Sequence, residues 1–252
     1  MGHLQPFDTR IQDSMILTFV MLSSLNACTP MHMAMPSELD GGAVLPVGGR
    51  GDLRGGYTVG GYRVSPQPRG FVSHERSDYI ASTPTPLIEP FTLVITAPDG
   101  ATNEVACELR ATFQSGFNDS WRYADGQVEC TGEGVVLSWQ RAADKMVTGS
   151  VSVGGEAFAF TPVVNIAGDD FQTNAGAMLR RGETAVAAVE RLPPGQVTLA
   201  PGAGANAERA AVILLAVVIT TEDTLSHWTL NGRTEASEHV QVMPDTYNQA
   251  PR

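Results

Sequence analysis

Ala210-Ala-Val-Ile-Leu-Leu-Ala-Val-Val-Ile-Thr-Thr221 is the stretch that decides the fold, because it runs for twelve residues without a charge. Val and Ile favour a strand, but an apolar run of this length favours a helix. We predict a helix over 207–220, with Asn206 as its N-cap and Glu208 in its first turn, where a carboxylate complements the helix dipole. A helix of this length spans about 21 Å, too short to cross a bilayer. Because it is apolar on every side, it must be buried on every side.

The rest of the body is patterned as short strands. Over 105–113 every second residue is apolar, and Glu108, Arg110 and Thr112 lie between them, as in a strand with one buried face. Further candidates follow through 161, with Gly-rich turns and no helical pattern between them, which favours antiparallel pairing. In a protein made of strands, an apolar helix is buried when the sheet wraps around it. We therefore predict a mainly β fold: an antiparallel β-barrel or roll around one buried C-terminal helix.

The N-terminal segment has the features of an export signal. Met15–Leu22 is almost unbroken apolar sequence, with the length of a signal-peptide h-region. Leu25-Asn-Ala-Cys28 then resembles the lipobox of bacterial lipoproteins. This resemblance implies a signal peptide over 1–27, a lipid on Cys28, and a place in the bacterial cell envelope at the outer membrane. The alternative is a buried N-terminal helix with an incidental cysteine, and translation could begin at Met1 or at Met15.

Composition divides the remaining chain into three parts. Residues 28–56 are rich in Gly and lack apolar periodicity, so we predict a flexible tether there. Residues 57–221 form the predicted β-rich domain, including its helix. Residues 222–252 are predicted to be a polar tail outside the barrel.

The cysteine count fits export. Cys107 and Cys130 lie on the apolar phase of their predicted strands, and an exported protein matures where such pairs oxidise. With Cys28 lipidated, the other two cysteines form an even pair. We predict a Cys107–Cys130 disulfide; the alternative is two free buried thiols in a cytosolic protein.

A helix enclosed by strands resembles the barrel of tubby C-terminal domains and phospholipid scramblase-like proteins. The segments Val186–Glu190, Gly195–Leu199 and Arg209–Leu215 also resemble the ends of some bacterial lipoproteins of unassigned activity. These resemblances imply a fold and carry over no catalytic residue.

Composition excludes some partners. The net charge is −11, and no basic run is present, so we predict no nucleic-acid partner. Gly202–Ala207 has the form GxGxxA of a dinucleotide-binding turn, but too little chain follows it to build a parallel sheet. We identify no catalytic residue, no metal site and no cofactor.

One cluster near the lipobox suggests chemistry. Met31, His32, Met33 and Met35 place three thioethers and an imidazole within five residues, a donor set that suits Cu(I). We expect a lipid-anchored envelope protein with a non-catalytic binding or structural role, held at the membrane by its lipid and open to a protein partner. The alternatives are an envelope enzyme of unrecognised type and a periplasmic Cu(I)-binding protein that uses these four residues.

Overall fold

A computed structural model describes residues 31–49, 56–67, 73–74, 85–115, 121–142, 148–168 and 172–230. The predicted signal peptide, Cys28 and the tail beyond Leu230 lie outside these residues. All described residues except Met31 belong to one compact unit, His32–Arg252.

The described residues form thirteen strands, one short 3₁₀ helix and one long α-helix. In chain order they are η2 (Ser37–Leu39), β1 (Val44–Gly48), β2 (Tyr57–Val59), β3 (Tyr62–Pro66), β4 (Ser73–His74), β5 (Thr85–Thr96), β6 (Thr102–Ser115), β7 (Trp121–Gly132), β8 (Val135–Ala142), β9 (Thr148–Val153), β10 (Glu156–Asn165), β11 (Gln172–Arg181), β12 (Thr184–Glu190), β13 (Gln196–Leu199) and α2 (Ala205–Leu230).

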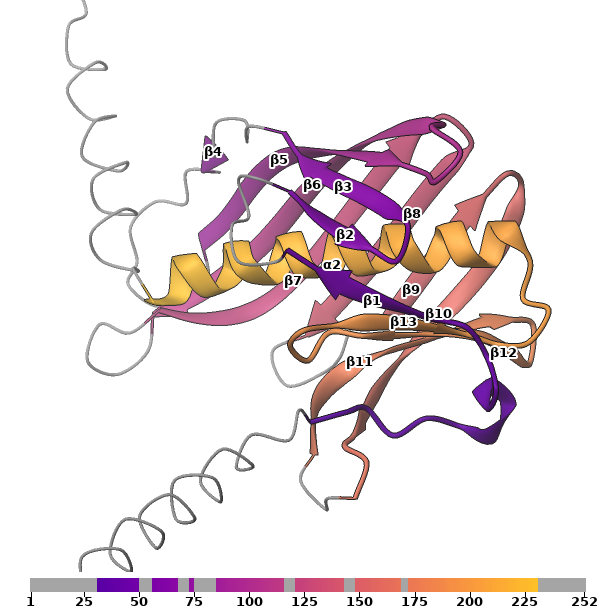
Figure 1. Ribbon diagram of the computed structural model, residues 1–252. Coiled ribbons are helices and arrows are strands. Elements are labelled where there is room, and N and C mark those ends of the chain that lie inside the picture. The colour runs from indigo at the N-terminus through magenta and orange to yellow at the C-terminus, as the bar shows by residue number, and fades with distance from the viewer. Residues whose placement is uncertain are drawn as a thin grey trace, which may run out of the picture. The chain divides into compact units, whose positions relative to one another are not determined.

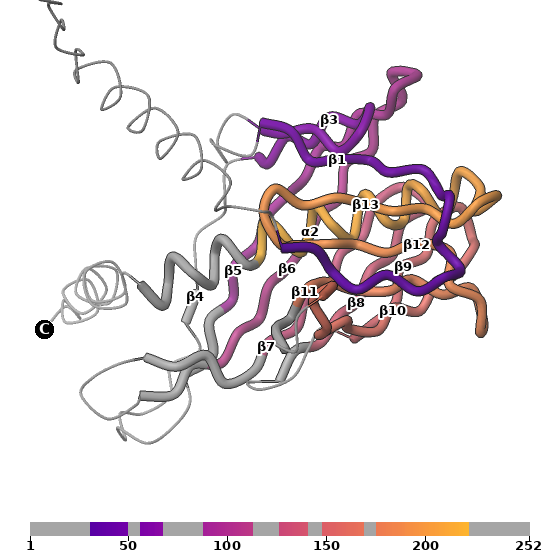
Figure 2. Tube along the Cα trace, turned by 60° about the horizontal axis from the view of Figure 1, so that its bottom comes forward, coloured from indigo at the N-terminus to yellow at the C-terminus, as the bar shows by residue number. Residues whose placement is uncertain are grey.

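The strands close into an antiparallel barrel. From β5 to β13 each strand pairs with the next along the chain, and β13 then pairs with β1, which continues through β2 to β3. Pairing of β3 with β5 closes the ring, so all thirteen strands except β4 belong to it. Figure 2 shows β1 and β13 side by side, although most of the chain separates them.

Helix α2 runs through the barrel (Figure 1) and contacts strands around the ring, among them β3, β7, β9 and β12. The four consecutive side chains Ala211–Leu214 point in four directions around the helix, and each is at most 2% exposed. The predicted mainly β fold around a buried C-terminal helix is therefore confirmed. No helix in the described part of the chain has both the length and the hydropathy to cross a bilayer.

The ends of the helix differ from the prediction. The helix begins at Ala205, and the carbonyl of Gly204 accepts a hydrogen bond from the Glu208 amide, which is the position of an N-cap. The prediction that Asn206 is the N-cap is therefore wrong. The helix also continues past 220 to Leu230, because the polar residues after Thr221 include no Gly or Pro to stop it.

The predicted tether over 28–56 is wrong for part of its length, because η2 and β1 lie inside it. A Cβ on Gly42 would lie 1.6 Å from the carbonyl oxygen of Leu199, so this glycine permits close approach of two backbones. Val44–Gly48 is too short to show the alternation that identified the longer strands. Glycine content was thus a poor indicator of flexibility here.

The two ends of the barrel carry different connections. One end, the turn end, has two-residue turns at 60–61, 133–134, 154–155 and 182–183, the turn at 97–101, residues 40–43 and the start of α2. At the opposite end, the loop end, lie the strand ends Gly48, Tyr57, Pro66, Thr85, Ser115, Trp121, Ala142, Thr148, Asn165, Gln172, Glu190 and Gln196, together with the described connections 166–168 and 191–195.

Candidate functional site

The barrel interior is filled by α2 and the inward-facing side chains of the strands. Leu214 and Leu215 are fully buried, as the all-round apolar run predicted. The Tyr57 hydroxyl donates a hydrogen bond of 3.3 Å to the Ala216 carbonyl, so even an inner polar group is directed at the helix. The interior is therefore the core of the domain, and candidate sites among the described residues lie at its ends and on its outer wall.

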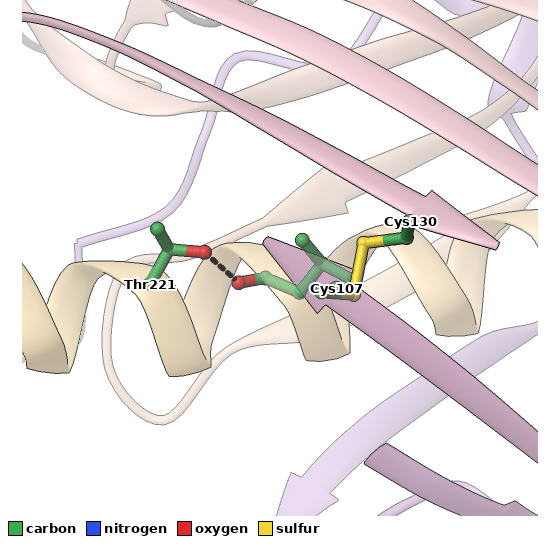
Figure 3. The surroundings of a disulfide bond; sticks show 4 residues. Cys107, Cys130 and Thr221 are labelled. Atoms are coloured by element: carbon green, nitrogen blue, oxygen red, sulfur yellow. Dashed lines mark hydrogen bonds between the residues drawn. A yellow bond between two sulfur atoms is a disulfide. The ribbon is translucent and has the colours of Figure 1, made fainter. Parts of the chain in front are cut away.

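The predicted disulfide is present. Cys107 on β6 lies opposite Cys130 on β7 in the register of the sheet, and their Cα atoms are 4.0 Å apart. Figure 3 shows the bridge together with Thr221 of α2, whose hydroxyl donates to the Val217 carbonyl. Both cysteines are buried in the core. This position fits a bridge that holds two neighbouring strands together.

A polar network surrounds the start of α2 at the turn end. The Arg181 guanidinium lies 2.5 Å from a Glu156 carboxylate oxygen, donates to the Ala203 carbonyl at 3.0 Å, and lies 5.5 Å from the ring centroid of Phe158. Asn206 donates to the same Glu156 carboxylate at 3.2 Å. These contacts tie the helix entry to β10 and β11, so they have a clear structural role.

Also at the helix start, Arg209 donates to the Asn103 side chain at 2.7 Å. Burial, followed by the hydrogen bond to Glu208 and by the negative charge of that residue, raises the pKa of Tyr62 to about 12. Tyr62 therefore stays protonated at neutral pH and cannot act as a base there. The network at the turn end therefore holds the start of the helix against the barrel wall.

The N-terminal strap, which we define as His32–Leu39, lies on the outer wall of the barrel. Its Ala34 amide donates to the Asn165 carbonyl at 2.9 Å, and its His32 carbonyl accepts from the Ala167 amide at 2.8 Å. These bonds pair the strap with the chain at the end of β10. The segment that was predicted to be free is thus attached to the barrel from its first described residues.

Apolar contacts hold the strap as well. Met33 is 1% exposed, and a Cβ on Gly176 would lie 2.9 Å from its sulfur, so the glycine leaves room for the thioether. A small cluster, separate from the main core, forms beneath the strap. Its buried members are Met33, Leu39, Ala175, Met178, Ala185 and Ala188.

Glu190 at the end of β12 anchors the strap. Its side chain is 1% exposed and accepts hydrogen bonds from the Met33 amide at 3.0 Å and from the Gln196 side chain at 2.8 Å. His32 Nδ1 lies 3.2 Å from the same carboxylate. Glu190 was not predicted from the sequence, where the available signal was a single acid directly after the small, apolar residues 185–189. A buried carboxylate with three partners is a strong, directional attachment.

The structure does not gather the proposed copper ligands. The Met33 thioether is buried in the cluster under the strap, and Met35 is only partly buried beside it. Met31 is more than half exposed, and His32 Nδ1 is engaged with Glu190. In the described segments there is also no group of three or more His, Cys, Asp or Glu side chains that could hold a metal ion.

In comparisons with protein-family models, curated proteins and solved structures, nothing matches this chain.

Proposed function

We propose that the protein is a lipid-anchored component of the bacterial cell envelope, attached through Cys28, with a non-catalytic binding or structural role. The observation that carries the non-catalytic role is the buried helix. Ala207–Thr221 occupies the interior in which barrels of this kind otherwise hold a ligand. The proposed binding or structural role is therefore assigned to the outer wall and the ends of the barrel.

Two further features support a place in the envelope. The Cys107–Cys130 bridge is the kind of bond that persists in an oxidising compartment. The lipobox-like Leu25–Cys28 supplies the proposed anchor. A barrel around a C-terminal helix also agrees with the tubby and scramblase-like resemblance, which we keep as a proposal about the fold family alone.

The test of this proposal is the state of Cys28 in a native bacterial host. We expect the mature chain to begin at Cys28, with an intact mass that includes the acyl chains, and to fractionate with membranes. The Cys28→Ala variant should lose the lipid and leave the membrane fraction, whereas Cys107→Ala with Cys130→Ala should keep both. A chain in which unmodified Cys28 is still joined to Ala27 would contradict the proposal.

A further inference from the structure

We infer that the loop end of the barrel, next to His32, lies against the lipid headgroups, and that the turn end projects away from the membrane. The surface involved is the described part of the loop end near the strap: His32, 166–168 and 191–195. The inference rests on the proposed lipid anchor at Cys28. It adds a contact surface, a partner in the form of an anionic or zwitterionic bilayer surface, and a fixed orientation.

The length of chain between Cys28 and the strap limits how far the barrel can lie from the lipid. A lipid on Cys28 would lie at the membrane surface, and the strap begins only four residues later, at His32. Four residues of fully extended chain span at most about 14 Å. An anchored barrel must therefore have His32 within about 14 Å of the lipidated residue.

His32 is firmly attached to the barrel. The strap pairs with Asn165 and Ala167, and Glu190 bonds to His32 and Met33. These contacts hold His32 close to the described segments 166–168 and 191–195. Because Met33 is buried against the barrel, the strap adds no free length of chain between the anchor and the barrel wall. The limit on His32 is consequently a limit on the loop end.

The turn end lies far from the loop end. β11 runs from the loop end to the turn end and contains ten residues. At about 3.3 Å per residue, and tilted by about 40° as barrel strands are, it separates the two ends by about 25 Å along the barrel axis. With the loop end at the headgroups, the turn end is thus well clear of the membrane.

The charge distribution points the same way. By sequence, the segments that join the strands at the loop end carry seven Asp or Glu and six Lys or Arg, a net charge of −1, whereas the connections at the turn end carry no Lys or Arg. The turn end carries exposed acids on its connections: Asp40, Asp99, Glu133 and Glu183. An anionic lipid surface repels those acids, so the turn end is the less favourable face for the membrane.

Site-specific labelling can measure this orientation, because the proposed chemistry occupies all three native cysteines. Single cysteines are introduced as Ala167→Cys at the loop end and Glu183→Cys at the turn end, since both native side chains are exposed. Each is labelled with a fluorophore in the lipidated protein, which is then reconstituted into phosphatidylcholine and phosphatidylglycerol vesicles that carry a nitroxide on the headgroup. We expect quenching at position 167 to be at least threefold stronger than at position 183.

The matched control inserts fifteen Gly and Ser residues between Thr29 and Pro30, which leaves Leu25–Cys28 intact. Such an insert adds a coil-like reach of about 20 Å. We expect the ratio of quenching to fall towards one in this variant, while vesicle binding is unchanged.

Two outcomes would overturn the inference and leave the anchor standing: equal quenching at the two positions without the insert, or a ratio that the insert does not change. A failure of the proposed lipid anchor would give a different result in these experiments. A protein without acyl mass on Cys28 that fails to float with vesicles would remove the anchor itself, and the orientation with it.

Discussion

The barrel interior and the strap on the outer wall are both buried, but they are held by different forces. Around the middle of α2 the contacts are largely apolar, with Leu214, Leu215 and Ile219 fully enclosed by strands. Beneath the strap the apolar cluster is small, and the buried carboxylate of Glu190 supplies directed hydrogen bonds. Apolar burial is non-directional and grows with area, so a long helix can rely on it. A short strap buries too little to fix its own position and needs a polar attachment.

The largest effect is expected from an acid placed beside the helix core. Leu214→Asp would bury a carboxylate without a partner, at a cost of several kcal/mol against a total domain stability of about 5–15 kcal/mol. We expect the variant to lack a cooperative unfolding transition when followed by circular dichroism.

The control for this variant is Val136→Asp, because Val136 is 57% exposed on the outer face of β8. It should unfold within about 0.5 kcal/mol of the parent. A Leu214→Asp protein with the parent's transition midpoint would show that the interior around the helix is not closed.

The disulfide is expected to have the next largest effect. The bridge closes a sequence separation of 23 residues, for which the chain-entropy model gives about 3 kcal/mol. The double variant Cys107→Ala and Cys130→Ala should therefore unfold at a lower urea concentration with its strap contacts intact. Peptide mapping without reductant should recover the two cysteines linked in the exported protein. Free alkylation of both thiols in folded, exported protein would contradict the bridge.

These differences explain which parts of the fold could be predicted from the sequence. The run Ala210–Thr221 and the alternation over 105–113 identify the helix and the strands, because each pattern is local and long. The position of the strap depends on a fit between Met33 and Gly176, which are far apart in the sequence, and local patterns carry no information about it. The copper hypothesis was unsupported for the same reason: adjacent donors on an extended segment face different surroundings.

The start of α2 also shows that a local sequence preference is not enough to predict the structure. Asn206 has the residue type of an N-cap, but Glu156 on β10 engages its side chain, and Gly204 takes the capping position instead. A tertiary contact therefore overrides a local preference. Glu190 was missed because its importance depends on partners at 32, 33 and 196, which only the folded barrel brings together.

A smaller and more local effect is expected at the strap. Glu190→Gln keeps one acceptor but removes the charge, and hydrogen bonds to charged groups contribute about 1.5–3 kcal/mol. We expect faster hydrogen exchange at the amides of Met33 and Ala34, with exchange in 207–219 unchanged, by mass spectrometry of peptides from each region. Glu183→Gln, at an exposed turn, should leave both regions as they are. Equal acceleration in the strap and the helix would show that the two regions unfold as one unit.

The smallest effect is expected at Tyr62, where the helix start meets the barrel. The pKa of Tyr62 is raised to about 12 in the folded protein, against about 10 in the unfolded chain. Below pH 10 the phenol is protonated in both states, so its contribution to stability is fully present. Between pH 10 and 12 the unfolded chain loses this proton first, and the contribution is lost as the pH rises towards 12.

Tyr62→Phe isolates this titration, because it removes the phenol while keeping the ring in the core. We expect the variant to be less stable than the parent by about 1 kcal/mol at pH 8, through loss of the hydrogen bond to Glu208, and the difference to shrink as the pH rises above 10. The difference in absorbance at 295 nm between parent and variant should titrate near pH 12. A difference that titrates near pH 10 would show that Tyr62 is open to solvent, and that the polar network at the helix start is looser than the apolar packing further along α2.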